Sequence, residues 1–272
     1  MSKVAHIALH TLLLAVAVLM LFPMTWMIIT SLHEHPEQYE TLWEMIRAPY
    51  SLLNYTEALN SDSFSRYFVN SIAVGLAVTG GNILFCFLAG YALARRRVPG
   101  SKLVFATLLA VLIIPPQVIM IPLFRLMVEF RWINSYAALI VPWLITPFGI
   151  FLVKQYVESL PAAVEEAARL DGASEFYVLF RIVMPLCAPI LTVLGIYVFL
   201  GNWNSFLYPF LFTNDEAHRT LPVGLAFYVG KQSIDWGHLM AGASISALPV
   251  LTVFAFFQRQ IIKGLTAGAV KE

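Results

Sequence analysis

Charged side chains are absent from six long stretches of the sequence and are concentrated between them. Asp, Glu, Lys and Arg do not occur in residues 4–33, 67–94, 103–124, 132–153, 182–214 and 236–258. A helix needs about 20 apolar residues to cross a hydrocarbon layer of about 30 Å, and every stretch reaches that length. The pattern therefore predicts six transmembrane helices.

The composition agrees with a membrane protein. Of the 272 residues, 59% are hydrophobic and 12% are charged, and the mean hydropathy is +0.76. Soluble domains have about 45–50% apolar and about 25% charged residues. We therefore interpret residues 1–272 as one all-α transmembrane domain, and we expect membrane lipid around it and no nucleic acid as a partner.

Prolines recur inside the apolar stretches, among them Pro23, Pro115, Pro116, Pro185 and Pro249. Each proline removes a helix N–H group and kinks the axis, and lipid tolerates this only where neighbouring helices or a cavity satisfy the freed carbonyls. The pattern is typical of a bundle that lines a cavity and moves.

Lys and Arg favour an orientation with both chain ends in the cytoplasm. Eleven of the 17 then lie on cytoplasmic segments, in agreement with the positive-inside rule. The Arg95-Arg96-Arg97 cluster contributes most, because it directly follows the second stretch. Residues 34–66 then form an external loop, and residues 158–185 form a cytoplasmic loop.

The external loop 34–66 is net acidic and rich in aromatic residues, so we expect short amphipathic pieces there, at the membrane interface or facing an external partner. His33 and His35 flank Glu34, but a lone pair of histidines without a further ligand is typical of solvated loop. We therefore assign no metal site to this chain.

The apolar stretches offer no energy source of their own. Their polar residues are amides and hydroxyls such as Asn70, Asn82 and Gln117, whereas ion-coupled carriers commonly rely on ionisable groups at membrane depth. The sequence also lacks a P-loop and any recognisable catalytic motif. A partner that supplies energy is the first hypothesis, a stand-alone ion-coupled carrier the second, and a membrane-bound enzyme the third.

The cytoplasmic loop 158–185 predicts a helix, a corner and a second helix. Pro161 suits a first helical turn, and residues 162–170 are good helix formers. Gly172 can adopt the left-handed conformation that ends a helix, Ser174 can cap the next helix, and Pro185 is expected to close it.

The first of these helices carries a low stripe of small residues, Val164, Ala167 and Ala168, beside Glu165 and Glu166. Such a ridge fits a groove on another protein, and an interfacial helix lying on the bilayer is the alternative. The loop is therefore the candidate docking element.

This loop resembles the EAA motif of permease subunits in binding-protein-dependent ABC importers. That motif reads EAA, three residues, Gly, nine residues and I-x-L-P. The chain has Glu166-Ala167-Ala168, Gly172 and residues 182–185, with Met184 in place of Leu. Residues 171–174 read DGAS, as in carbohydrate permeases.

Three further segments resemble the MalG-like family of the maltose type. They are WNSFLYP at residues 203–209, IPPQ at residues 114–117 and QRQIIKGLTAGAVK at residues 258–271. The resemblance thus covers most of the chain. It implies the type I ABC importer permease fold, with six transmembrane helices and a cytoplasmic coupling-helix pair.

The resemblance also implies partners. They are a second homologous permease, two ATPase subunits and an extracytoplasmic solute-binding protein, in a bacterial or archaeal inner membrane. This chain would bind no cofactor and catalyse nothing, and ATP and Mg²⁺ would belong to the ATPase subunits. The solute would be a sugar, with sugar phosphates and polyols as alternatives.

Two residue sets follow from the resemblance. The residues expected to couple to the ATPases are Glu165, Glu166, Ala167, Ala168, Leu170, Asp171, Gly172 and Ala173. The candidate substrate path contains Asn202, Trp203, Asn204 and Tyr208, whose amides and aromatic faces suit a sugar. For that second set, contact between helices within the chain is the competing interpretation.

Overall fold

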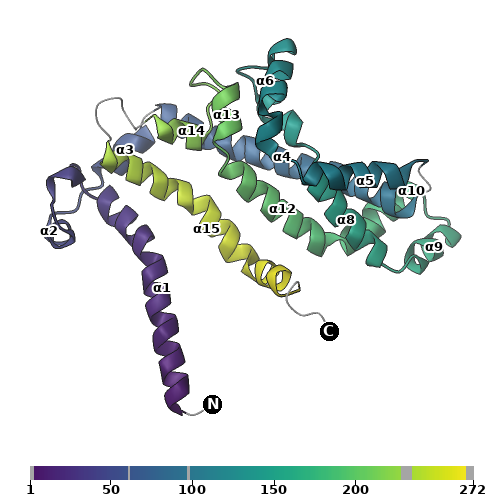
Figure 1. Cartoon of the computed structure of the whole chain (residues 1–272), viewed down its shortest axis with the longest axis horizontal. Coiled ribbons are helices and arrows are strands. Elements are labelled where there is room, and N and C mark those ends of the chain that lie inside the picture. The colour runs from purple at the N-terminus through teal and green to yellow at the C-terminus, as the bar shows by residue number, and fades with distance from the viewer. Residues whose placement is uncertain (1–2, 61, 97–98, 228–234, 268–272) are drawn as a thin grey trace. The chain divides into compact units, whose positions relative to one another are not determined.

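The computed structural model describes residues 3–60, 62–96, 99–227 and 235–267, and all regular elements in these residues are helical (Figure 1). Arg97 and the end of the C-terminal segment, 268–272, lie outside the described residues. The chain divides into two compact units, Met1–Phe68 with Val223–Pro249 and Val69–Pro222 with Val250–Glu272. The predicted all-α fold is confirmed.

The helices α4 and α15 each contribute to both units. In chain order the elements are α1 (Lys3–Ser31), η1 (Pro36–Gln38), α2 (Leu42–Arg47), α3 (Leu53–Asn60), α4 (Asp62–Arg95), α5 (Ser101–Leu112), η2 (Pro116–Ile119), α6 (Met120–Glu129), α7 (Tyr136–Ile140), η3 (Val141–Trp143), α8 (Pro147–Ser159), α9 (Ala163–Leu170), α10 (Glu175–Tyr177), η4 (Val178–Val183), α11 (Met184–Leu186), α12 (Ala188–Trp203), α13 (Leu207–Phe212), α14 (Leu221–Ala226) and α15 (Trp236–Ala267).

Four of the predicted spans correspond to single candidate spans in the described residues, and one of these is built from α7, η3 and α8. They are Ala5–Ser31, Ser63–Arg95, Tyr136–Ser159 and Trp236–Gln260, each long and apolar enough to cross a membrane. The other two stretches form bent helix pairs, so the count reaches six only if each pair is one span.

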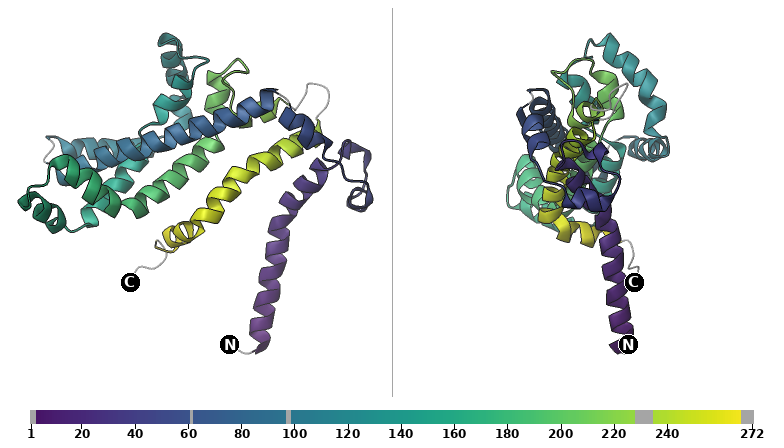
Figure 2. Two further views of the ribbon diagram at one scale, coloured as in Figure 1. Left: turned by 180° about the vertical axis from the view of Figure 1, so that it is seen from behind. Right: turned by 90° about the vertical axis from the view of Figure 1, so that its left-hand side faces the viewer.

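The third apolar stretch is not one straight helix, as its length predicted. α5 and the following η2–α6 segment meet at 99°, and Figure 2 shows α6 turned away from α5. Pro115 and Pro116 lie at the bend, where Pro115 has the extended ψ of 132°. Neither proline has an N–H to donate, and Pro116 disfavours a helical conformation at the residue before it.

The fifth stretch is also bent, by 74° between α11 and α12. Pro185 was predicted to close the second helix of the loop 158–185, and this helix ends one residue later, at Leu186. The helix widens into a π-helical segment, η4, and continues through Pro185, which lies in the first turn of α11. Both a π turn and a proline are recognised causes of a kink.

The first unit is held together by polar contacts around the loop 34–66. Asn54 is buried, and its side-chain amide donates to the carbonyls of Ser31 at 3.1 Å and His33 at 2.7 Å. The hydroxyls of Ser31 and Tyr55 lie 2.6 Å apart. The amphipathic pieces predicted in 34–66 are η1, α2 and α3, which leave Trp43 exposed.

His33 differs from its prediction as solvated loop. It is buried, its Nδ1 lies 2.8 Å from the carbonyl of Ile29, and its ring packs edge-on against Tyr39 and Tyr50. Because the aromatic rings follow it only later in the chain, the local H-x-H pattern could not show this burial. His35 is exposed, as predicted.

The second unit has a continuous core built on α4, α5, α8 and α12. Phe87, Val153 and Leu194 are fully buried in it, and α8 packs against both α5 and α12. Gly90 lets α4 approach α8, because a Cβ there would lie 2.8 Å from the side chain of Val153. Figures 1 and 2 show α9 at the end of this unit, beyond the last turn of α4.

Candidate coupling loop and its polar network

The corner after α9 forms as the sequence predicts. Gly172 has φ of +86°, and its N–H and that of Ala173 donate to the carbonyls of Arg169 and Ala168 at 3.1 and 3.0 Å. This is the Schellman pattern of a helix end. Ser174 then caps the next helix by accepting a hydrogen bond from the N–H of Tyr177. α9 starts at Ala163, so Pro161 precedes it and does not occupy its first turn.

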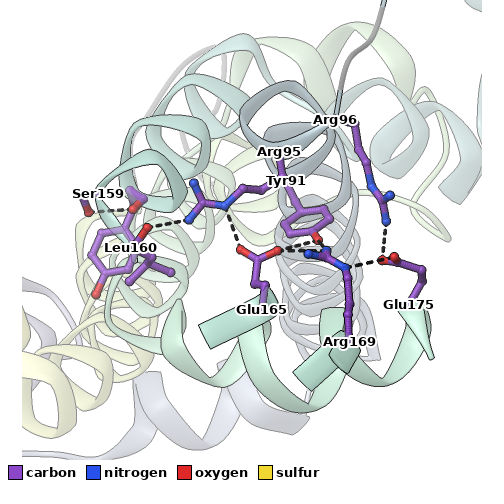
Figure 3. A network of polar contacts seen from close by, with 9 residues as sticks. Tyr91, Arg95, Arg96, Ser159, Leu160, Glu165, Arg169 and Glu175 are labelled. Carbon is purple, nitrogen blue, oxygen red and sulfur yellow. Dashed lines mark hydrogen bonds and ion pairs between the residues drawn. The ribbon is translucent and has the colours of Figure 1, made fainter. Parts of the chain in front are cut away.

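Glu165 lies on the buried face of α9, with only 4% of its side chain exposed. Its Oε1 accepts from Nε of Arg95 at 2.7 Å, and its Oε2 accepts from the hydroxyl of Tyr91 at 2.9 Å (Figure 3). Arg95 also donates through Nη2 to the carbonyl of Leu160 at 2.6 Å. One carboxylate therefore connects α9 with α4, and Arg95 connects both with the end of α8.

A second, more exposed part of the network crosses the corner. Arg169 donates through Nη2 to Oε2 of Glu165 at 3.3 Å and through Nε to Oε1 of Glu175 at 3.1 Å. Arg96 also pairs with Glu175. The hydrogen bond with Glu175 raises the pKa of Arg169, which stays charged at any physiological pH.

α9 consequently has two different faces. Glu165 is buried, and Ala168 and Ala173 pack against the core of the second unit. The opposite face is open, and 88% of Leu170 is exposed. Of the eight predicted coupling residues, the exposed ones are Glu166, Ala167, Leu170, Asp171 and Gly172. The small-residue stripe is thus divided, since Val164 and Ala167 face outward and Ala168 faces inward.

The candidate substrate path does not form one open surface. Trp203 is buried, and Tyr208 donates to the carbonyl of Pro116 at 2.6 Å while its ring packs edge-on against Trp143. Asn204 is exposed and donates to the carbonyl of Leu200 in the preceding turn. Tyr208 therefore ties α13 to the proline bend, as the competing interpretation predicted.

Of the side chains in the network, Glu165 alone was predicted as a site residue, and both of its donors on α4 were missed. Tyr91 was not singled out, and Arg95 served to predict the orientation of the chain. Their spacing of four residues places both on one face of α4, which was the available signal. Glu165 lies 70 residues later in the chain than Arg95, so no local pattern could pair them.

Comparison with known proteins identifies the family of this chain. The family described as "Binding-protein-dependent transport system inner membrane component" matches residues 82–266, which include α9 and its network. The chain belongs to this family. It is therefore a non-catalytic, multi-pass permease subunit of an inner-membrane transport system that depends on a binding protein.

Curated relatives of this permease extend over almost its full length. It is 34% identical to the arabinooligosaccharides transport system permease protein AraQ of Bacillus subtilis, over 99% of this chain and 97% of that protein. It is 34% identical to the trehalose/maltose transport system permease protein MalG of Thermococcus litoralis, over 94% of this chain and 93% of that protein.

Solved structures share the permease fold. A chain of a bacterial ABC transporter that imports the acidic polysaccharide alginate superposes with a TM-score of 0.84 at 20% identity, covering 95% of this chain and 98% of that one. A second alginate transporter structure, in complex with a periplasmic protein that binds an alginate pentasaccharide, gives a TM-score of 0.62 at 17% identity, covering 94% of this chain and 95% of that one.

Proposed function

We propose that this permease is one subunit of an ATP-driven carbohydrate importer and is moved from the cytoplasm through α9. It pairs with a second, homologous permease, with two ATPase subunits that hold ATP and Mg²⁺, and with an extracytoplasmic solute-binding protein. Binding of ATP draws the ATPase subunits together, and the loop 158–185 transmits this motion to the bundle, which alternates between inward- and outward-open states.

The observation that carries the proposal is the division of α9 into a held face and a free face. Glu165 fixes the helix to its own subunit, while Leu170 and the residues around it remain open to a partner. Phe176 and Tyr177, just beyond the corner, are exposed as well. Exposed apolar groups grouped on a polar loop are typical of a protein–protein interface.

The orientation is part of the proposal. Arg95 and Arg96 follow the span directly and join the network around α9, so the positive-inside rule places α9 in the cytoplasm. Both chain ends then lie in the cytoplasm, and the loop 34–66 faces the solute-binding protein.

The binding of α9 to the ATPase subunits has to be strong. To move a two-state population from 1:99 to 99:1 requires about 5.5 kcal/mol of differential binding. Small residues at Ala167 and Gly172 allow close approach to a groove, and the exposed carboxylate of Glu166 can pair with a cation there. We therefore place the docking contact on Glu166, Ala167, Leu170, Asp171 and Gly172.

A carbohydrate solute is supported by the named relatives, which transport arabino-oligosaccharides and trehalose or maltose. Sugar phosphates and polyols are the competing solute classes. The ligand found in the solute-binding protein that copurifies with the complex separates these classes, and uptake of radiolabelled maltose, trehalose and arabino-oligosaccharides by proteoliposomes tests the first class directly.

The coupling role is tested by Glu166→Lys and Gly172→Val. Both variants are expected to reach the membrane but to copurify with less ATPase subunit and to abolish uptake. Unchanged copurification together with unchanged uptake contradicts the docking role. Transport by the purified single chain without ATP would instead favour a stand-alone ion-coupled carrier.

A further inference from the structure

We propose that Glu165 and Arg95 form a positioning pair that makes the last turn of α4 follow α9 when α9 is displaced. This inference rests on the proposed function, because the displacing force comes from the ATPase subunits. It assigns the two adjacent glutamates to opposite tasks: Glu166 faces the partner, and Glu165 holds the permease's own helix.

The hydrogen bonds of Glu165 hold its carboxylate in one position. Each oxygen has its own donor on α4, Nε of Arg95 at 2.7 Å and the hydroxyl of Tyr91 at 2.9 Å (Figure 3). Tyr91 and Arg95 lie one turn apart on the same helix face. Two donors on separate turns restrict both the position and the rotation of the carboxylate.

Arg95 extends the link to a third element. Its Nη2 donates at 2.6 Å to the carbonyl of Leu160, the residue that ends α8. α8 packs on α12, and α4 packs on α8 at Gly90. A displacement of α9 therefore reaches the helices of the core through one guanidinium group.

The other connections of α9 are weaker. In the chain, α9 is joined to its neighbours by the short turns at Pro161 and Gly172. α9 also packs against η4, and its contact with the buried core is made by Ala168, whose side chain is a single carbon. The ion pair of Arg169 and Glu175 leaves 34% and 49% of these side chains exposed, and exposed pairs are screened by water and salt.

Burial explains why the pair transmits a displacement. The exposed fractions are 15% for Arg95 and 4% for Glu165, so moving them apart would deprive two poorly solvated charges of their closest charged partners. The less costly response is that α4 moves with α9. Buried ion pairs contribute little net stability compared with apolar residues of equal volume, but leaving one of the two charges without the other is strongly unfavourable.

The test measures whether α9 and α4 move as one body. Nitroxide labels at Ala163→Cys on α9 and Leu76→Cys on α4, both at exposed positions, report one distance by pulsed electron paramagnetic resonance. The assembled complex is measured without nucleotide and after trapping with Mg-ATP and vanadate. We expect the same single distance in both states, and in Glu165→Gln a second distance that appears only on trapping.

Two variants serve as controls. Arg95→Lys keeps the charge opposite Glu165 and is expected to retain the single distance. Glu158→Gln removes an ion pair within α8, where Oε1 of Glu158 lies 2.7 Å from Nζ of Lys154, and is expected to behave as the unmodified complex. If Glu165→Gln does not accumulate, Arg95→Gln removes the other charge of the pair and is expected to show the second distance instead.

Each remaining outcome decides against the pair. A Glu165→Gln complex with one unchanged distance would overturn it, and so would a second distance in the unmodified complex. An Arg95→Lys complex that behaves as Glu165→Gln would also overturn it, as would an unchanged distance in Arg95→Gln where that variant replaces Glu165→Gln. Absence of ATPase subunits from the purified unmodified complex would instead refute the proposed function.

Discussion

The two ends of α4 bind neighbouring segments in different ways. Near its start, Asn70 donates to the carbonyls of Ala217 and Arg219 at 2.9 Å and accepts from the hydroxyl of Tyr136 at 2.7 Å. Near its end, Tyr91 and Arg95 hold the carboxylate of Glu165. The first site uses neutral groups and mostly backbone partners, whereas the second uses charges and side chains.

The difference follows from what each contact has to do. Neutral amides satisfy backbone groups without placing a charge in an apolar stretch, and Asn82, which donates to the carbonyl of Trp143 at 2.9 Å, does the same at mid-helix. Such contacts fix the fold. A charged pair instead joins side chains of separate elements, and the structure has one where the loop 158–185 meets α4.

The largest effect on stability is expected at the charged end. Arg95→Ala removes the closest cation from buried Glu165, and losing one partner of a buried pair costs about 3–5 kcal/mol. The lower part of that range is expected, because Arg169 still lies 3.3 Å from the carboxylate. The midpoint of thermal unfolding of the purified permease measures this, and an unchanged midpoint would show that the pair is not buried as described.

The neutral end should respond less. Asn70→Ala removes three hydrogen bonds, each worth about 0.6–2 kcal/mol in membrane proteins, and their partners include backbone carbonyls, so about 2 kcal/mol is expected. Asn204→Ala is the control, since within the part of the chain that the structure describes its amide donates to one carbonyl, that of Leu200 in the preceding turn. Equal unfolding midpoints for the two variants would contradict the role given to Asn70.

Substitutions at two glycines distinguish an effect on stability from an effect on transport. Gly172 and Gly100 have φ of +86° and +74°, and neither has an atom within 4 Å of the place of a Cβ. Replacement by Ala should therefore cost about 1–2 kcal/mol at both positions, through backbone strain alone. Only Gly172→Ala is expected to reduce uptake, and an equal loss of uptake in Gly100→Ala would mean that strain and not docking is being measured.

The smallest effect on stability is expected on the free face of α9. Leu170→Ser changes a side chain that is 88% exposed, so the unfolding free energy should change by less than about 0.5 kcal/mol. ATPase copurification should nevertheless fall clearly. Leu103→Ser on α5, where 73% of the residue is exposed, is the matched control and should leave copurification unchanged.

The sequence predicted those features that depend on neighbouring residues. The uncharged stretches located the helices, and Gly172 and Ser174 located the corner of the cytoplasmic loop, because helix ends are determined within a few residues. The bends at Pro116 and Cys187 were harder to predict, since a proline permits either a kinked span or a broken one and the surrounding packing decides.

The polar network around Glu165 could not be predicted from the sequence for a related reason. Glu165 and Glu166 have the same chemistry and adjacent positions, and only the packing of α9 on α4 shows which one is buried. The same holds for His33, whose burial depends on Tyr39 and Tyr50 in the following loop. Contacts between distant residues decided both cases.

We propose that ATPase subunits in the cytoplasm drive the permease by binding the free face of α9. Crosslinking tests this proposal most directly. Leu170→Cys on α9 and Trp43→Cys on the external loop are compared in the assembled complex, where the native cysteines Cys86 and Cys187 are buried. Crosslinking of Cys at position 170 to an ATPase subunit, with none from position 43, is the predicted result. A position 170 that reacts with a membrane-impermeant reagent from outside, or that never crosslinks to an ATPase subunit, would contradict it.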